Sequence, residues 1–156
     1  MVSWKQFVDD APDLAARLRA RFAAAPSHVL ATRTLTGSPR VSGTEVGFWG
    51  DDAWIGSTSR SGKSMDLLVD PRFVLHSNPG DGSRADGDVK IDGTVRSAPQ
   101  GDRRRAEVLA ARGAAEPFQL FWLDLDRVVL TTVEGDTTRV ETWRPDSGVH
   151  VVEQRG

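Results

Sequence analysis

Polar and apolar residues alternate in short runs over most of the chain, which predicts β-strands. In residues 88–97, for example, Val89, Ile91 and Val95 alternate with polar residues, a pattern typical of a half-buried strand. Turns rich in glycine, proline and aspartate join most of the runs, and tight turns imply antiparallel neighbours. The strands are predicted at residues 28–34, 40–49, 53–59, 72–76, 88–97, 120–133, 139–144 and 149–153.

Helical spacing is confined to a few short segments between these strands. Ser3 and Gln6 form a capping box that opens a short helix, and Pro12 suits the first turn of the next. Six to eight short, mostly antiparallel strands in a chain of this size favour a barrel, so we expect a mainly β fold with about three flanking helices. Besides the short helix that opens at the capping box, helical segments are predicted near residues 12–25, 63–69 and 103–112.

Composition narrows the classes of function. The chain of 156 residues suits one domain, residues 1–156, and its formal net charge of −2 favours neither nucleic acid nor an anionic membrane. It has no cysteine, which excludes disulfides and thiolate chemistry. We expect no metal site, because the three histidines fall on separate predicted strands without ligand spacing. With no signal-peptide pattern and no apolar run near the roughly 20 residues that span a bilayer, the expected location is the cytoplasm.

The stretch GSTSRSGKS, residues 56–64, is similar to the phosphate loop G-x-x-x-x-G-K-[ST] but has one residue too many. That loop joins a parallel strand to a long helix, whereas here Asp70 and Pro71 end the helix after about seven residues and the flanking strands look antiparallel. A nucleotide hydrolase is therefore the weakest alternative.

The chemistry of the same stretch nevertheless suits an anion. Ser57, Ser59 and Ser61 offer hydroxyl groups, and Lys63 places a cation at a helix start, where the backbone also favours negative charge. Successive side chains of a strand point to opposite faces. Every second residue of the predicted strand 40–49 therefore shares a face, which puts three polar residues together: Arg40, Ser42 and Thr44. Together these residues predict a phosphate cradle; the alternative is a solvated strand face beside a surface turn.

The order of features in residues 28–98 resembles the pyridoxamine 5′-phosphate oxidase-like family of flavin- and deazaflavin-binding split β-barrels. The resemblance rests on VLAT, GSPR, WIGS, the S-x-K loop before D-L and D-P-R, and DVKIDGTVRS. It implies a split β-barrel homodimer that binds FMN or the deazaflavin coenzyme F-420 at the subunit interface. It also implies that Ser61 and Lys63 contact the cofactor phosphate, with Ser57 beside them. Three residues of the preceding strand would then lie along the phosphate chain or the ring: Arg40, Ser42 and Thr44.

Two departures from the family pattern argue against vitamin oxidation. The best-known oxidases of the family have Arg-Lys in the loop, where this chain has the single cation Lys63, and their C-terminal substrate pattern is missing. The implied function is thus an oxidoreductase that carries out two-electron redox of a small organic molecule, with no side chain expected as general acid or base. The alternative is a non-enzymatic flavin- or haem-binding or ligand-sensing protein.

Aromatic residues late in the chain have two interpretations. Trp143 ends a strand and either stacks on a flavin ring or packs in the core, the simpler interpretation. The segment QLFWLDL, residues 119–125, predicts a homodimer interface that includes Phe118, Phe121 and Trp122.

Charge on the surface favours FMN over coenzyme F-420. Arg60, with Arg72 or Arg84, would attract the longer acidic tail of the deazaflavin. The short helix and the neighbouring loop, however, carry acids that would repel that tail: Asp66, Asp70, Asp81, Asp86 and Asp88.

Overall fold

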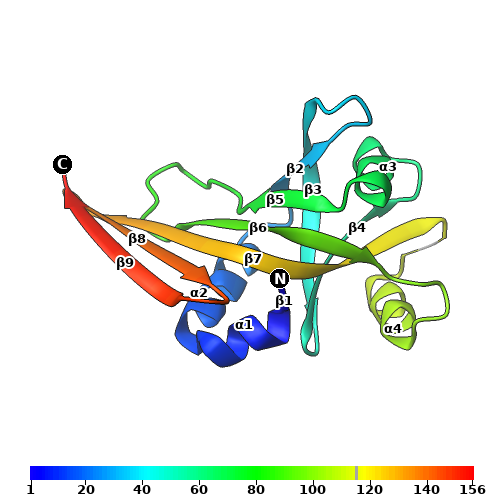
Figure 1. The fold of residues 1–156 in the computed structure, drawn as a ribbon, viewed down its shortest axis with the longest axis horizontal. Coiled ribbons are helices and arrows are strands. Elements are labelled where there is room, and N and C mark those ends of the chain that lie inside the picture. Colours follow the sequence, from blue (N-terminus) through cyan, green and yellow to red (C-terminus); the bar gives the residue numbers. More distant parts are fainter. Residues whose placement is uncertain (115) are drawn as a thin grey trace.

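The computed structural model describes residues 1–114 and 116–156, and its centre is a closed β-barrel (Figure 1). Six strands follow one another in the order β4-β3-β2-β5-β6-β7, and pairing of β7 with β4 closes the barrel. All of these pairings are antiparallel, as the tight turns predict. The strands are β2 (His28–Arg33), β3 (Pro39–Trp49), β4 (Asp52–Thr58), β5 (Arg72–His76), β6 (Asp88–Ser97) and β7 (Phe118–Glu134).

The long strand β7 serves two parts of the sheet. Its first residues pair with β4, whereas residues 128–134 pair with β8 (Thr137–Arg144), and of these, residues 128–131 also pair with β6. Strand β9 (Gly148–Arg155) then pairs with β8, and the short β1 (Val2–Ser3) pairs with β7. Figure 1 shows β8 and β9 projecting from the barrel as an extension of the sheet.

The core follows from the predicted alternation. Leu30, Leu75, Ile91 and Val128 lie opposite one another in β2, β5, β6 and β7, and each is at most 2% exposed. Burial of one such side chain contributes about 1.5–3 kcal/mol. The pairing register between β6 and β7 shifts by one residue at a β-bulge between Asp92 and Gly93.

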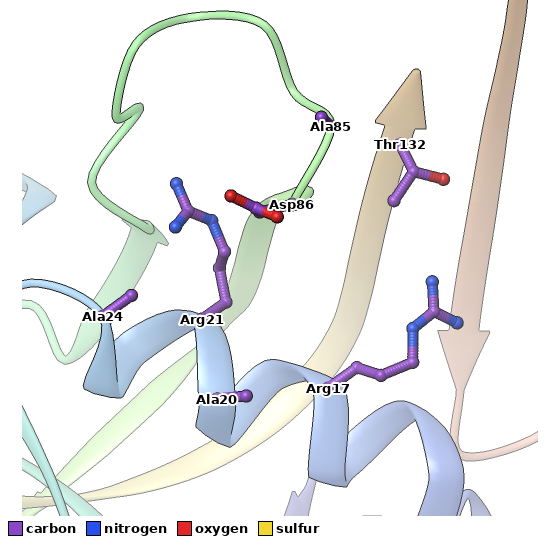
Figure 2. A pocket seen from close by; sticks show the side chains of 7 residues that line it. All are labelled: Arg17, Ala20, Arg21, Ala24, Ala85, Asp86 and Thr132. Atoms are coloured by element: carbon purple, nitrogen blue, oxygen red, sulfur yellow. The ribbon is translucent and has the colours of Figure 1, made fainter. Parts of the chain in front are cut away.

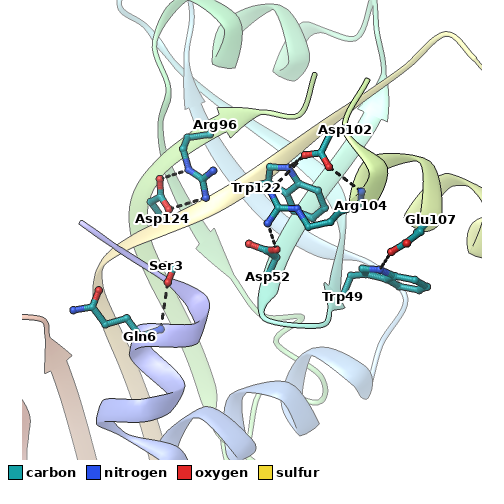
Figure 3. Close-up of polar contacts among 10 residues, drawn as sticks. All are labelled: Ser3, Gln6, Trp49, Asp52, Arg96, Asp102, Arg104, Glu107, Trp122 and Asp124. Carbon is teal, nitrogen blue, oxygen red and sulfur yellow. Dashed lines mark hydrogen bonds and ion pairs between the residues drawn. The ribbon is translucent and has the colours of Figure 1, made fainter. Parts of the chain in front are cut away.

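Helices α1 (Trp4–Asp10) and α2 (Pro12–Ala23) pack against this core. The predicted capping box is present in part, since the Ser3 hydroxyl accepts a 3.3 Å hydrogen bond from the Gln6 N–H (Figure 3). Pro12 occupies the first turn of α2, whose buried face consists of Leu14, Ala15, Leu18 and Phe22. With α3 (Gly62–Val69) and α4 (Arg103–Arg112), the described chain has four helices.

Polar contacts attach α4 to the outside of the barrel (Figure 3). Asp102 accepts hydrogen bonds from the Arg104 N–H and from Nε1 of Trp122, while Arg104 contacts Asp52 and lies over the Trp122 ring. Trp49 donates to Glu107 at 3.0 Å. These contacts hold the N-terminal half of α4 against β7 and against the turn between β3 and β4.

The interface predicted for QLFWLDL is not supported, because the monomer itself buries this segment. Phe121 and Trp122 are 2% and 1% exposed. The physical reason is that β7 pairs on both sides here, with β4 and β6, and lies between the main core and a smaller core that includes Val108 of α4.

Among the described residues, the helices all lack the length and apolar character that a membrane crossing requires.

Candidate functional site

The loop between β4 and α3 is organised by its own serines. The Ser57 hydroxyl donates to Ser61 at 2.7 Å, and Ser61 donates to Ser64 at 3.0 Å. Ser61 is the N-cap of α3 and accepts a hydrogen bond from the Ser64 N–H, while Ser64 donates to the carbonyl of Thr58. These hydrogen bonds connect the loop to the start of α3, and Lys63 lies in the first turn of that helix.

Lys63 is a half-buried cation with a neutral partner. Its Nζ donates a 2.6 Å hydrogen bond to the Gly43 carbonyl oxygen of β3. Burial lowers the pKa of Lys63, and the nearby Glu45 carboxylate opposes this change. Because a carbonyl carries no formal charge, the charge of Lys63 is only partly compensated.

Lys63 lines a hollow of about 540 Å³, which we call the β3–β4 hollow. The wall is formed by strand backbone and a serine, because β3 contributes residues 43–45 and β4 contributes Gly56 and Ser57. Arg112 of α4 and Phe118 of β7 also line the hollow, as do Pro26 and Ser27. Of the seven predicted cofactor residues, the hollow brings together Thr44, Ser57 and Lys63.

Arg112 supplies a second cation that the sequence reasoning missed. Its guanidinium lies 5.4 Å from the Trp54 ring centroid and 5.2 Å from that of Phe118, and it forms an ion pair with Glu45. The only local signal was an arginine in the last turn of an arginine-rich helix, which is equally typical of a solvated face. Its place in the hollow depends on the packing of α4.

Arg40 forms an ion pair with a carboxylate of α3. Its Nε contacts Asp66 of α3 at 2.7 Å, and Thr32 donates to the same carboxylate oxygen. A Cβ at Gly62 would lie 2.8 Å from Arg40 Nη1, so this glycine lets Arg40 lie across the helix start. The charge of Arg40 is thus compensated by a buried carboxylate, and Arg40 does not line the hollow.

The shared strand face itself agrees with the register. Arg40, Ser42 and Thr44 lie opposite Thr32, Leu30 and His28 of β2. Thr44 is buried and donates to the Glu45 carbonyl, and Ser42 is half-buried and outside the hollow lining.

Trp143 lies in the main core and is fully buried, with its ring 4.7 Å from that of Phe7. Core packing, the simpler prediction, is confirmed, and the structure does not bring Trp143 to the hollow. The histidines do not gather either: within residues 1–114 and 116–156 no group of potential ligands is arranged for a metal ion.

Among the acids expected to repel an F-420 tail, Asp66 and Asp70 lie in and directly after α3 as predicted, whereas those of the loop of residues 78–87 do not lie beside it. Asp70 pairs with Arg72, whose hydrogen bonds lower the pKa of the Asp70 carboxyl to about 2. The loop of residues 78–87 lies against α2, where Arg21 holds the carbonyls of Asn78 and Gly87. Its acids therefore do not adjoin α3, and that part of the argument for FMN was wrong.

Comparison with known proteins gives a fold and no closer relative. No family model matches the sequence, and no curated protein matches it. The structure is similar to a pyridoxamine 5′-phosphate oxidase-related FMN-binding protein from Nostoc punctiforme, with 13% identity, a TM-score of 0.62, and 94% of this chain and 97% of that chain covered.

Two further solved structures are similar to the chain. PhzG from Burkholderia lata, in complex with tetrahydrophenazine-1-carboxylic acid, has 16% identity and a TM-score of 0.64 over 92% of this chain and 88% of that chain. HutZ, a heme storage protein from Vibrio cholerae, has 15% identity and a TM-score of 0.60 over 71% and 89%. The chain therefore has the split β-barrel fold of pyridoxamine 5′-phosphate oxidase-like proteins.

Proposed function

We propose that the protein binds FMN in the β3–β4 hollow, as a homodimer, and uses it for two-electron oxidation or reduction of a small organic molecule. The observation that carries the proposal is the convergence of Lys63 and Arg112, from separate elements, on one hollow. The negative charge of a phosphate group is complementary to such a pair of cations. The predicted cradle also included Ser61, which supports this site by capping α3 and orienting Ser57.

The donor groups present fit a phosphorylated flavin. Lys63 supplies a point charge and Arg112 a planar fork of donors, two complementary ways to hold a phosphate. Gly43 and Gly56 expose backbone to a ligand, and Phe118 offers an aromatic wall. When bound, the flavin supplies the two-electron chemistry, and the chain supplies binding and position.

Glu45 favours FMN over coenzyme F-420 in this proposal. Its half-exposed carboxylate lines the hollow beside Arg112 and would repel the acidic tail of the deazaflavin. The FMN-binding structural neighbour from Nostoc punctiforme points the same way.

The outer face of β2, β3 and β5 is the proposed subunit interface, in place of QLFWLDL. Val41 and Val74 both lie opposite Ala31 of β2, so the three side chains share one face. Val41 is 70% exposed, and α3 exposes Leu68 and Val69 as well. Apolar surface of this kind marks interaction sites. Light scattering of wild type and Val41→Asp tests it, because this exposed substitution spares the monomer core: wild type should be a dimer and the variant a monomer.

A haem-binding or ligand-sensing function is the alternative, favoured by the heme storage protein among the structural neighbours. Haem iron needs an axial ligand such as histidine. In the described part of the chain, the hollow lining contains no histidine, and both ring nitrogens of His28 are engaged.

Two measurements test the proposal. The first is the visible spectrum and mass of any molecule that co-purifies, followed by titration with FMN, coenzyme F-420 and haem at two salt concentrations. FMN should bind tightest, and absence of FMN binding would overturn the proposal. Deazaflavin binding at least about tenfold tighter, with a steeper salt dependence, would reverse the choice of cofactor. The second is reduction of bound flavin by NAD(P)H or a reduced deazaflavin, since binding without turnover indicates a sensor.

A further inference from the structure

A second hollow, of about 410 Å³, lies between α2 and the glycine-rich loop of residues 78–87 (Figure 2). We call it the α2 hollow; it shares no lining residue with the β3–β4 hollow. Its apolar part consists of Ala20 of α2, Ala24 directly after α2 and Ala85 of the loop, with Thr132 of β7. Small side chains on both walls leave the space open.

Two arginines border this hollow, and both are already held in place. Arg21 donates from Nε to the Gly87 carbonyl at 2.5 Å and from Nη2 to the Asn78 carbonyl at 2.8 Å. Arg17 Nη1 contacts Glu141 of β8 at 2.7 Å. A guanidinium has five N–H donors, so each arginine keeps donors for a ligand. Because their side chains are already ordered, binding costs less conformational entropy.

Asp86 introduces the opposite charge at the same hollow. It lines the space, and residues 1–114 and 116–156 provide it with no ion pair or side-chain hydrogen bond. Figure 2 shows Arg21 extending from α2 toward the loop that carries Asp86, while Arg17 extends the other way, toward the strand next to that of Thr132, where it contacts Glu141 of β8. The hollow therefore offers donors for a carboxylate and an unpaired acceptor for an ammonium group.

The charges decide which ligand suits the hollow. Glu141 compensates Arg17, and Asp86 opposes Arg21, so the surroundings have little net charge and would not favour a phosphate or another multiply charged anion. A zwitterion needs both signs and brings no net charge. We propose that the α2 hollow binds a small α-amino acid, with its carboxylate toward Arg21, its ammonium toward Asp86 and a short apolar side chain over the alanines. This inference is independent of the proposed function.

The test uses the full chain without added cofactor and the probes L-valine and 3-methylbutanoate, which differ only in the ammonium group. Ligand-observed NMR should detect saturable binding of L-valine and at least about tenfold weaker binding of 3-methylbutanoate, because one charge-assisted contact is missing. Equal binding of the two, or no binding of L-valine at millimolar concentration, would overturn the proposal.

Two variants locate the binding. Ala20→Leu fills the hollow and should abolish L-valine binding, whereas Ala16→Leu, exposed on the same helix outside the hollow, should not change it. Asp86→Asn should remove the preference for L-valine over 3-methylbutanoate. Unchanged L-valine binding by Ala20→Leu would place the ligand elsewhere and refute the assignment.

Discussion

The two hollows each contain a pair of basic residues, but they compensate the positive charge to different degrees. In the β3–β4 hollow, Lys63 donates to a neutral carbonyl, and only the exposed Glu45 faces Arg112. In the α2 hollow, Arg17 contacts the buried Glu141, and Asp86 stands beside the space. The first arrangement suits a dianionic phosphate and the second a zwitterion. The number of basic residues therefore says little about the charge of the ligand. The extent to which neighbouring acids neutralise those residues says more.

Lys63→Ala tests the less compensated hollow and has the largest expected effect. Loss of a charge-assisted contact costs about 1.5–3 kcal/mol, so FMN affinity should fall about ten- to hundredfold. Riboflavin, which lacks the phosphate, should be nearly indifferent. Titration of both flavins measures the difference, with Arg60→Ala on the same exposed loop as the matched control. Unchanged FMN affinity would remove Lys63 from the site.

Glu45→Gln should have a smaller effect in the opposite direction. The Glu45 carboxylate occupies Arg112 in the ligand-free chain, so a neutral amide frees the guanidinium for the phosphate. We expect FMN affinity to rise about two- to fivefold, the scale of an exposed charge interaction. Calorimetric titration at low salt measures it, and Glu134→Gln, an exposed acid outside the hollow, is the control. Weaker FMN binding by Glu45→Gln would show that the ion pair holds Arg112 in a useful position.

His28 lies outside the lining of both hollows, and its effect on stability should be the smallest. Its Nδ1 accepts from the Asn78 N–H at 2.9 Å, so Nε2 carries the proton and donates to the Phe22 carbonyl. Burial lowers the pKa of His28 from its usual 6.5, and Arg21 lowers it further. As pH falls below 6.5, the unfolded chain gains a proton before the folded chain does. The neutral ring therefore contributes to folding stability above pH 6.5. This contribution decreases as the pH falls from 6.5 to the lower pKa that His28 has in the folded chain.

Urea unfolding at about pH 7.5 and about pH 5.5 checks this direction, with His28→Gln as the comparison. The variant should lose less stability on acidification than wild type. Equal losses would show that other groups cause the pH dependence.

Much of the barrel was predictable because its determinants are local. Alternation in residues 88–97 reflects a strand with one buried face, and the Ser3 cap follows from a side chain three residues from its partner. Two features were not predictable in this way: the closure of the barrel by pairing of β4 with β7, and the burial of QLFWLDL inside the monomer. Burial of Trp122 depends on a helix packed over it, which no local pattern of β7 specifies.

For the site, the sequence alone determined that residues 56–64 form a serine-rich helix start with Lys63, because capping and turn preferences act within a few residues. The tertiary structure alone decided which cations face the β3–β4 hollow. Arg40 pairs with Asp66, 26 residues away in the sequence, and Arg112 of α4 pairs with Glu45, 67 residues away. Charges interact through space, so the partner of each basic side chain depends on strand register and helix packing rather than on its neighbours in the chain.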